Sequence, residues 1–531
     1  MKKRFFAMLL AAMLVLTCIA SALPAFARTL KDGRLAPKYS TPAGYNDNDY
    51  QKLVTFLELA DENGVKNGEK LNLLNEWDWD YDPADPETWG FAYYFEDIDY
   101  WYYQGIIWTG QEEKRITNVF IADRGCVGKL DVSGCDELYR LDCSFNALSG
   151  LDIHGCTDLW WLGCDGSGLT ELELSDSADL CYLYCSNNAL TELDVSSNNS
   201  LVDLNCGYND LTELNISSNT ELEFLCCDGD SLSELDLSEN PLLEVLQCED
   251  NCLTMLSVSE CHDLEELDCS GNALEELDLS CNSSLLYLYC EENSLTELDL
   301  SNNICLEEVS CGNNSLIDLN VSECEELFCL RCEYNELTEL DLSNNTALGN
   351  LFCEHNKLTE LDLSDCTELD YLQCFGNALT LLDLSNNEML SLDLICAEGD
   401  GFIGCSLGYS YGTIYALPGE SAVFEGFYDQ NGAFISEGEW DDESDAFIYA
   451  FEGDLPGNMI SARFAPVGIL PGDVDANGSV EVSDAILALR HAMGLIELTQ
   501  EQFAAADMDG SGEIRIDDAI TILRTAMGLL G

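Results

Sequence analysis

Lysine and arginine are scarce in this sequence. Its 531 residues contain 21 Lys and Arg against 100 Asp and Glu, which gives a formal net charge of −79. A surface that binds phosphate groups needs clustered Lys and Arg, so nucleic acid is excluded as the main ligand, and docking on anionic lipid is disfavoured. Apolar residues still make up 47% of the chain. The chain can therefore bury real cores and is not a disordered acidic tail.

Histidine is rare too. The four histidines, His154, His262, His355 and His491, lie far apart and stand in no H-E-x-x-H or triad context. Acids are so abundant that two carboxylates at the spacing of a glycosidase pair carry no information. The sequence offers no catalytic residues, and we predict a protein that is not an enzyme.

The one long apolar run lies at the N-terminus. The basic start Lys2-Lys3-Arg4 precedes apolar residues up to about Leu23, and an Ala-Phe-Ala site follows at 25–27. This order predicts a signal peptide over residues 1–27. A transmembrane anchor is the alternative, but polar residues interrupt the run, and no later stretch is long and apolar enough to span a membrane. The mature chain is expected to be secreted, extracellular and free of the membrane.

A 21-residue repeat fills residues 116–395. Its frame is L-x-x-[LV]-x-C-x-x-N-x-L-x-x-L-D-[LVI]-S, as in residues 348–364. Leu141 and Cys143 alternate with polar neighbours, and this period of two predicts a strand. The LDLS segment alternates as well and predicts a second short strand on the opposite face of the coil. One coil cannot bury its apolar side alone, so the coils stack around a shared core.

This frame resembles the leucine-rich repeat, and its cysteine slot is similar to the cysteine-ladder branch of the internalin-like repeats. The resemblance implies a mostly β solenoid of about 12–13 coils. We call these twelve residues, spaced 21 apart, the ladder cysteines: Cys143, Cys164, Cys185, Cys206, Cys227, Cys248, Cys269, Cys290, Cys311, Cys332, Cys353 and Cys374.

The ladder cysteines have two interpretations. One is a redox or metal array, since coils ~4.8 Å apart would permit disulfides by distance. The favoured one is packing, because Cys is a small hydrophobe that suits a narrow coil. Two further columns predict turn bonding between coils. One holds Asn three residues after a ladder cysteine, as at Asn146, with Ser167 and Asp230 as the exceptions. The other holds either Cys or Asn, as at Cys261 and Asn282.

The exposed positions of the strands are the predicted ligand surface, on the concave face of the solenoid. Aromatic side chains there suit contact with protein or sugar, and acids such as Asp228, Glu249 and Glu354 stand among them. Stacking that merely stabilises the sheet is an equal alternative. The predicted ligand-binding residues are Trp161, Tyr182, Tyr184, Phe224, Tyr287, Tyr289, Phe352, Tyr371 and Phe375.

The solenoid has predicted caps at both ends. Residues 28–115 form the N-terminal cap, with an amphipathic helix around Tyr50–Ala60 whose N-cap is Asp47 or Asn48. Residues 396–466 lose the 21-residue frame and show short alternating runs and turns. They predict a small β module that serves as spacer and cap.

Two acidic loops near the C-terminus predict two calcium ions. Each loop carries oxygen side chains at positions 1, 3 and 5, Gly at 6 and Asp at 12, and calcium prefers such hard oxygen ligands. The loops are 34 residues apart, and an apolar helix is expected after each. The predicted metal residues, with backbone carbonyls included, are Asp473, Asp475, Asn477, Ser479 and Asp484, then Asp507, Asp509, Ser511, Glu513 and Asp518.

An EF-hand is the alternative for these loops, but Pro471 and Gly472 cannot make a good helix entering the first loop. The tandem, Asp-ending arrangement over residues 467–531 resembles a type I dockerin, a small α-helical domain. That resemblance implies docking into a cohesin of a scaffold or cell-surface protein. Carried over to this chain, the cohesin contacts are Val482, Ser483, Leu489, Arg490, Ile516, Asp517, Leu523 and Arg524.

The sequence as a whole predicts a secreted ligand-binding subunit. Its solenoid engages an unknown protein or glycan, and its dockerin attaches it to a cohesin-bearing, cellulosome-like assembly. One alternative is a component of polysaccharide breakdown with glycoside-hydrolase-associated activity, because dockerins usually accompany such enzymes. The other alternative is a surface adhesin.

Overall fold

The computed structural model describes residues 39–71, 81–95, 100–390, 392, 394–408, 411–419, 422–441, 444, 446–452, 459–466, 472–475, 479–508 and 513–527. The predicted signal peptide lies outside these residues. Among the described residues, no helix combines the length and the apolar character that a membrane crossing requires.

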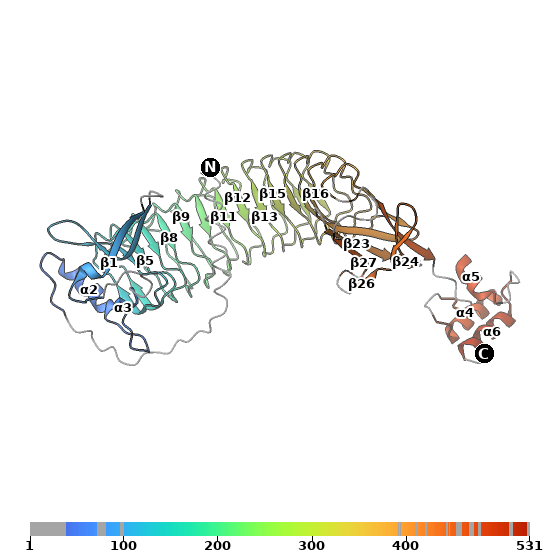
Figure 1. Ribbon diagram of the computed structural model, residues 1–531, viewed down its shortest axis with the longest axis horizontal. Coiled ribbons are helices and arrows are strands. Elements are labelled where there is room, and N and C mark those ends of the chain that lie inside the picture. Colours follow the sequence, from blue (N-terminus) through green and yellow to red (C-terminus); the bar gives the residue numbers. More distant parts are fainter. Residues whose placement is uncertain are drawn as a thin grey trace.

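A parallel β ladder runs along the solenoid, with one strand in each coil (Figure 1). It begins at β3 (Ile116–Phe120) and continues through one three-residue strand for each of the twelve coils that carry a ladder cysteine. These strands are β5 (Arg140–Asp142), β7 (Trp161–Gly163), β8 (Tyr182–Tyr184), β9 (Asp203–Asn205), β10 (Phe224–Cys226), β11 (Val245–Gln247), β12 (Glu266–Asp268), β13 (Tyr287–Tyr289), β15 (Glu308–Ser310), β17 (Cys329–Arg331), β18 (Asn350–Phe352) and β19 (Tyr371–Gln373).

The strand register equals the sequence repeat. Leu225 of β10 pairs with Leu246 of β11, which in turn pairs with Leu267 of β12, each 21 residues further on. These central leucines and all twelve ladder cysteines are fully buried, while the residues on either side of each leucine face outward. The predicted mostly β solenoid is therefore confirmed, with the ladder cysteines in its core.

The second strand of each coil forms only in places. Among the described residues it is present as β4 (Val127–Asp131), β6 (Ala147–Asp152), β14 (Glu297–Asp299), β16 (Asp318–Asn320) and β20 (Leu381–Asp383). Elsewhere the LDLS segment keeps its alternating burial without strand pairing. The Asp side chain of this segment accepts a hydrogen bond from the amide two residues later in both cases. Asp236 does so from Ser238, where the strand is absent, and Asp299 does so from Ser301, at the end of β14.

The asparagine that stands three residues after a ladder cysteine, in every coil except those with Ser167 and Asp230, joins neighbouring coils. The Asn293 amide group donates to the carbonyls of Cys269 and Cys290, at 2.9 and 3.2 Å. Its Oδ1 accepts from the backbone N–H of Leu274 at 2.9 Å. Each such side chain satisfies buried backbone groups of two coils, as the sequence predicted.

The column that holds either Cys or Asn also joins neighbouring coils, on the other side of the coil. Asn282 donates to the carbonyls of Val258 and Cys261, at 3.0 and 2.8 Å. Where the column holds cysteine, the thiol reaches the same kind of acceptor, since Cys261 Sγ donates to Asn240 O at 3.6 Å. A thiol is a weaker donor than an amide, yet the two side chains fill one role in one turn.

The N-terminal cap covers the first coil with helices and a β hairpin. Its elements are α2 (Asp47–Leu57), α3 (Asn67–Lys70), the 3-10 helix η1 (Pro86–Thr88), β1 (Gly90–Phe95) and β2 (Tyr100–Trp108). The N-cap of α2 is Asn46, one residue before the earlier of the two predicted positions, because its side chain accepts from the Asp49 amide. Strand β2 pairs antiparallel with β3 and so extends the main sheet.

The segment after the last coil closes the other end of the solenoid. It contains β21 (Leu394–Glu398), β22 (Gly401–Leu407), β23 (Tyr411–Pro418), β24 (Ala422–Asp429), β25 (Phe434–Ser436), β26 (Glu439–Asp441), β27 (Ala446–Glu452) and β28 (Met459–Pro466). Strand β22 pairs antiparallel with β19, and β21 pairs antiparallel with β20. Both sheets of the last coil are thus covered, and their edges are not left open.

Three short helices form the C-terminal unit: α4 (Val482–Ala492), α5 (Gln500–Ala506) and α6 (Ile516–Ala526). They share a small core of Val474, Ala485, Ala488, Ala506, Ile514, Ala519 and Ile522. This core is separate from the continuous core of the solenoid and its caps.

Candidate functional site

The first predicted calcium loop brings three carboxylates together. Asp473, Asp475 and Asp484 each offer an oxygen, and these atoms lie within 4.8 Å of one another. Asp473 and Asp484 are buried, whereas Asp475 is exposed. Among the described residues this is the one group of three or more acidic, His or Cys side chains with such convergence.

Asp484 fixes the shape of this loop. Its Oδ1 accepts from the amides of Val474 and Asp475, at 2.8 and 3.0 Å, and its Oδ2 accepts from Glu481 at 2.8 Å. The side chain is fully buried at the start of α4. A carboxylate has about four lone-pair directions, so three hydrogen bonds still leave capacity for a cation.

The second loop repeats this arrangement 34 residues later. Asp518, at the start of α6, accepts from the amides of Met508 and Arg515, at 3.0 and 2.8 Å. It is as buried as Asp484 is. The structure therefore builds two equivalent loop-and-helix units, each organised by the aspartate at its twelfth position.

Of the remaining predicted calcium ligands, three lie within the described residues and three do not. Asp507 lies at the C-terminal end of α5, while the side chains of Ser479 and Glu513 are exposed. Asn477, Asp509 and Ser511 lie outside the described residues.

The loops differ in what precedes them: α5 leads straight into the second loop, whereas only a few residues separate β28 from Asp473. An EF-hand pair would need a helix before each loop.

The donor set fits calcium. Hard carboxylate and carbonyl oxygens are the ligands that calcium prefers, and it accepts 6–8 of them in irregular geometry. Asp473, Asp475 and Asp484 are three like charges held close together, which repel one another without a cation.

The predicted cohesin contacts lie on α4 and α6, and those two helices pack against each other. Val482, Ser483 and Arg490 are exposed, and so are their equivalents in the second unit, Ile516, Asp517 and Arg524. Leu489 and Leu523 are different, because they are half-buried and pack against the small core. Exposed Ile486 and Ile520 were not predicted; their spacing of four residues from Val482 and Ile516 is the signal in the sequence.

The predicted ligand-binding aromatics all lie on the outward face of the main sheet, and each is half-buried. Those near the ends of the solenoid contact rings of neighbouring coils. Trp161 lies 5.4 Å from Tyr184, and Phe352 lies 5.1 Å from Tyr371, between ring centroids. Phe375 stacks on Tyr415 of the C-terminal cap at 4.4 Å. Stacking that stabilises the sheet therefore accounts for part of this set.

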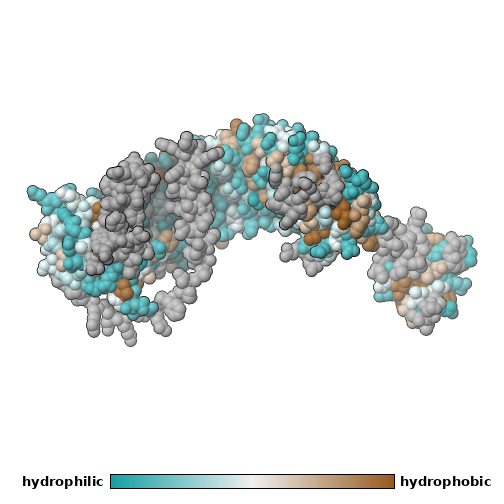
Figure 2. Space-filling view, viewed as in Figure 1, coloured by the Kyte–Doolittle hydropathy of each residue, from teal (hydrophilic) through white to brown (hydrophobic). Residues whose placement is uncertain are grey.

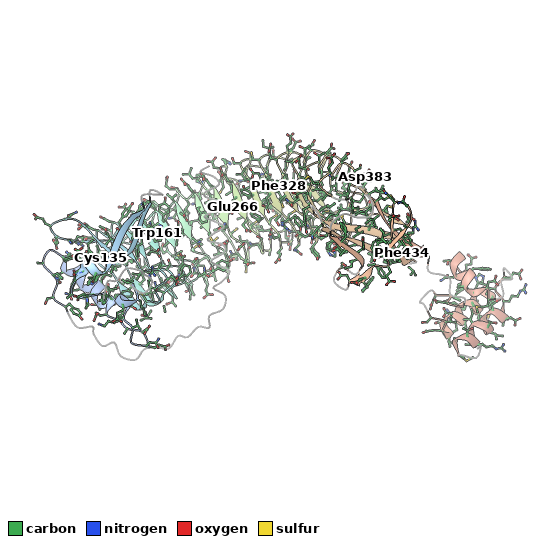
Figure 3. All side chains as sticks on the ribbon, in the orientation of Figure 1. Cys135, Trp161, Glu266, Phe328, Asp383 and Phe434 are labelled. Atoms are coloured by element: carbon green, nitrogen blue, oxygen red, sulfur yellow. The ribbon has the colours of Figure 1, made fainter. Side chains whose placement is uncertain are left out.

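Tyr139, Trp160, Arg140 and Arg331 also lie along the sheet and were not predicted from the sequence. Tyr139, Trp160 and Tyr182 form a row, with centroids 5.2 and 4.7 Å apart. Two guanidinium groups lie over rings of the face: Arg140 over Trp161 at 4.1 Å, and Arg331 over Phe352 at 3.9 Å. Figure 3 labels Trp161 and Phe328 at two points along the solenoid, with Glu266 between them.

The acids on this face are less exposed than the sequence suggested. Asp228 and Glu354 are only 7% and 8% exposed. Burial, followed by repulsion from Glu249, raises the pKa of Asp228 to about 7. Burial also raises the pKa of Glu249 to about 7, with a further contribution from Asp268. At neutral pH these carboxyls are poised between their charged and neutral forms.

The ladder cysteines from Cys143 to Cys353 lie where burial disfavours the thiolate form. Burial raises the thiol pKa of every member from Cys143 to Cys353. A thiol with a raised pKa is a poor nucleophile and a poor metal ligand. At the end of the ladder, Cys374 Sγ lies 3.5 Å from Cys405 Sγ of the cap. The environment favours packing over a redox or metal array.

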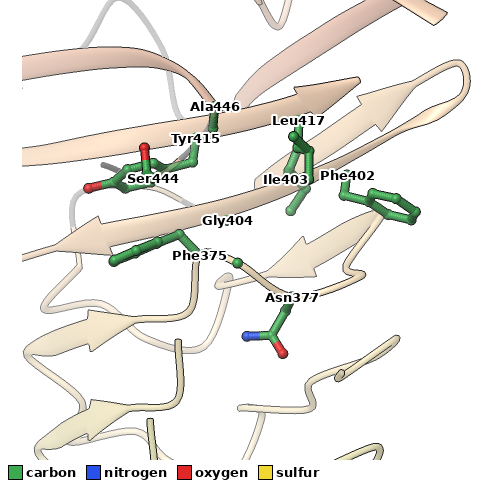
Figure 4. A pocket seen from close by; sticks show the side chains of 10 residues that line it. Phe375, Asn377, Phe402, Ile403, Gly404, Tyr415, Leu417, Ser444 and Ala446 are labelled. Atoms are coloured by element: carbon green, nitrogen blue, oxygen red, sulfur yellow. The ribbon is translucent and has the colours of Figure 1, made fainter. Parts of the chain in front are cut away.

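A small pocket lies where the last coil meets the C-terminal cap (Figure 4). Its volume of about 20 Å³ has room for little more than one water molecule. It is lined by Phe375, Gly376, Asn377, Phe402, Ile403, Gly404, Tyr415, Leu417, Ser444 and Ala446. A larger, open groove over residues 318–386 is lined mainly by Asp, Glu, Leu, Ser and Thr. Neither lining contains a His, Cys or Lys.

No protein-family model matches the chain, and no curated protein matches it either. Solved structures are similar to it. One is the functional domain of InlJ from Listeria monocytogenes, which includes a cysteine ladder; its TM-score is 0.49 at 25% identity, over 66% of this chain and 90% of that one. An internalin, InlF, of the same species has a TM-score of 0.40 at 20% identity, over 48% and 74%. YopM from Yersinia enterocolitica has a TM-score of 0.37 at 28% identity, over 46% and 57%.

Proposed function

We propose that this chain is a secreted, non-enzymatic binding subunit. Its solenoid holds a protein or glycan ligand on the outward sheet face, and its C-terminal unit is a type I dockerin that attaches the chain to a cohesin. The cohesin belongs to a scaffold or cell-surface protein of a cellulosome-like assembly. The observation that carries the docking half is the pair of loop-and-helix units 34 residues apart, each built around a buried aspartate, Asp484 or Asp518.

Calcium binding would couple to docking through these two aspartates. Each accepts loop amides and stands in the first turn of a helix, α4 or α6. A cation that binds the loop oxygens therefore also fixes where each helix begins. Val482 and Ile516 stand at those helix starts and are exposed. Bound calcium would supply charge neutralisation, and the chain's own residues would supply the docking surface.

The proposal that the solenoid binds a ligand rests on the residues of its outward sheet face. Half-buried aromatic rings such as Tyr287 and Tyr289 alternate with carboxylates on an extended sheet face, and repeat proteins use such faces for binding. In Figure 2 the middle of the solenoid, where no grey atoms cover it, is mostly hydrophilic, and hydrophobic residues appear toward its C-terminal end.

The test uses the full mature chain, residues 28–531, against a panel of immobilised cohesins. We expect at least one cohesin to capture the chain with calcium and to release it on chelation. Asp484→Asn with Asp518→Asn should abolish capture, whereas the exposed Asp236→Asn on the solenoid should not. Capture that survives chelation, or no capture by any cohesin, would contradict the dockerin assignment.

The alternative of a component of polysaccharide breakdown is tested on a glycan array with the same chain. Retention without turnover supports the binding subunit. Release of soluble sugars from a retained polysaccharide would instead establish an enzyme, and binding to intact cells without glycan retention would favour an adhesin.

A further inference from the structure

One long stretch of the solenoid contains neither lysine nor arginine. From Leu141 to Leu330 the chain has 41 Asp and Glu and no Lys or Arg. This stretch includes the strands from β7 to β15. The stretch supplies no Lys or Arg of its own, and at its N-terminal end Lys129 pairs with Asp152 at 2.8 Å. Cations that offset the rest of its negative charge must come from outside the stretch.

Part of that charge lies on the outward sheet face. We call the outward carboxylates around β10 to β15 the acidic sheet face, and they include Asp228, Glu249, Glu266, Asp268, Glu291 and Glu308. These acids differ from the exposed acids of the opposite face, because burial raises the pKa of Asp228, Glu249, Asp268 and Glu291. Water therefore solvates their charge poorly. A cation beside these acids would have a stronger electrostatic attraction than a cation beside exposed acids.

Some of these carboxylates also have oxygens without a partner. Glu291 Oε2 is buried and makes no hydrogen bond, and the same holds for Glu333 and Glu354 in the same column two and three coils further on. Glu354 is more than nine-tenths buried. A buried, unpaired carboxylate oxygen costs folding free energy, so this column is incomplete without a donor from elsewhere.

The two ends of the stretch without Lys or Arg show which donor fits. Arg140 and Arg331 flank this stretch, and each guanidinium lies over an aromatic ring of the main sheet, Trp161 or Phe352. The charge of Arg331 also offsets part of the rise in pKa that burial causes in Glu333 and Glu354. At this point a guanidinium of the chain itself stacks on an aromatic ring and acts electrostatically on two buried carboxyls.

The middle of the face repeats this setting without an arginine. Phe224, Tyr287 and Tyr289 are half-buried rings among the acids, and Tyr287 donates to Glu307 Oε2 at 3.2 Å. A guanidinium is planar, weakly hydrated and able to stack on a ring while it pairs with carboxylates, whereas an ammonium ion is a compact, strongly hydrated charge. The setting therefore favours arginine over lysine.

A divalent metal ion fits this face less well. Coils stack about 4.8 Å apart, so their carboxylates form a line and not a cage. Among the described residues, no three ligand groups of the sheet face converge as those of the first calcium loop do. Calcium needs 6–8 converging oxygens, but a polypeptide with several cations matches a line of acids.

We propose that the acidic sheet face binds an arginine-rich polypeptide segment of a partner protein. Its guanidinium groups stack on Phe224, Tyr287 and Tyr289 and pair with the neighbouring carboxylates. This inference rests on the proposed function of the solenoid as a binding surface, and it specifies the chemistry of the ligand. It is independent of calcium and of the C-terminal unit.

The test measures binding of fluorescein-labelled deca-arginine and deca-lysine to the full mature chain by anisotropy at 0.15 M salt. The sheet-face variant carries Glu249→Gln, Glu266→Gln and Asp268→Asn. The control variant carries Glu234→Gln, Glu276→Gln and Glu297→Gln, which removes three charges from exposed positions of the opposite face. Amides keep the oxygen acceptors that Glu249, Glu266 and Asp268 offer to Tyr208, Gln247 and Ser270.

We expect deca-arginine to bind several-fold more tightly than deca-lysine. The sheet-face variant should raise the Kd for deca-arginine by about tenfold, which corresponds to three charge pairs of about 0.5 kcal/mol each. The control variant should change the Kd by less than about threefold. Tyr287→Leu with Tyr289→Leu should remove the preference for arginine and leave deca-lysine binding unchanged.

Three outcomes would overturn the proposal. Equal affinity for the two peptides would mean charge attraction without guanidinium recognition, and equal losses in the two charge variants would mean that the sheet face is not the site. Saturable calcium binding that disappears in the sheet-face variant would make the face a metal site. Should the triple variant not fold, Glu266→Gln against Glu297→Gln gives the same comparison at single positions. The proposed docking function is tested separately: calcium-dependent capture by a cohesin would still support it after any of these three results.

Discussion

The solenoid should be more stable at mildly acidic pH than at pH 8. Asp228 is the residue on which this prediction depends most, because burial and then Glu249 raise its pKa from 3.8 to about 7. A folded-state pKa above the unfolded one means that the folded chain binds the proton more tightly. The resulting stabilisation is complete below the unfolded pKa and is lost as the pH rises through the folded pKa.

The magnitude follows from the difference in bound protons. One group that is protonated only in the folded state changes the free energy of unfolding by about 1.4 kcal/mol per pH unit. Through Asp228 alone, the free energy of unfolding should therefore fall by up to about 3 kcal/mol as the pH rises from 5 to 7. Glu249 and Glu354 titrate in the same direction, since burial raises the pKa of each to about 7. Below about pH 4 the trend reverses, because hydrogen bonds from serines lower the pKa of exposed carboxyls such as Asp236 and Asp278.

The assay is urea unfolding of the full mature chain at half-unit intervals from pH 4 to 8, followed by circular dichroism. We expect the midpoint to be highest near pH 5 and to fall steadily toward pH 8. Asp228→Asn should flatten that fall, whereas Asp236→Asn on the opposite face of the same coil should leave the slope between pH 5 and 8 unchanged. A midpoint that rises from pH 5 to 8, or an unaltered slope in Asp228→Asn, would refute the reasoning.

Three further predictions concern the columns and the sheet face. Asn282→Ala should lower the free energy of unfolding by about 2 kcal/mol, because two buried carbonyls lose their donor, whereas Asn282→Cys should cost less; equal losses would argue against the shared role of Asn and thiol. Alkylation of the native chain followed by mass spectrometry should label the exposed Cys252, Cys281 and Cys305 and leave the ladder cysteines as unlabelled thiols; ladder cysteines linked as disulfides between adjacent coils would contradict the packing account. Replacing Tyr182, Tyr184, Tyr287 and Tyr289 together by alanine should abolish retention of the solenoid ligand on an array, and unchanged retention by a folded variant would move the site elsewhere.

The period of the sequence was sufficient to predict the solenoid. A 21-residue repeat with leucine and cysteine on one side of a strand leaves only one way to bury the apolar positions, and the register of Leu225 on Leu246 follows from it. The second strand was less predictable. The LDLS segment keeps its alternating burial both in coils where it pairs as a strand and in coils where it does not. The hydrogen bond to its Asp side chain is present with the strand at Asp299 and without it at Asp236, so neither the period nor this bond decides where the strand forms.

The calcium loops could be predicted from the sequence more fully than the sheet face could. The loop aspartates stand at fixed spacing, so Asp484 and Asp518 could be singled out, and their burial at helix starts agrees with that role. On the sheet face, outward position suggested exposure, yet neighbouring coils bury Asp228 almost completely. The cost of that burial depends on which side chains flank an acid across three coils, and a single repeat frame does not contain this information.

The central claim is that calcium organises the C-terminal unit for docking. Isothermal titration of the full mature chain with calcium, at fixed pH after chelator removal, tests it most directly. The account predicts two ions per chain, one ion in Asp484→Asn or Asp518→Asn, none in the double variant, and much weaker binding of magnesium. Unchanged uptake in the double variant, or no calcium uptake by the native chain, would contradict it.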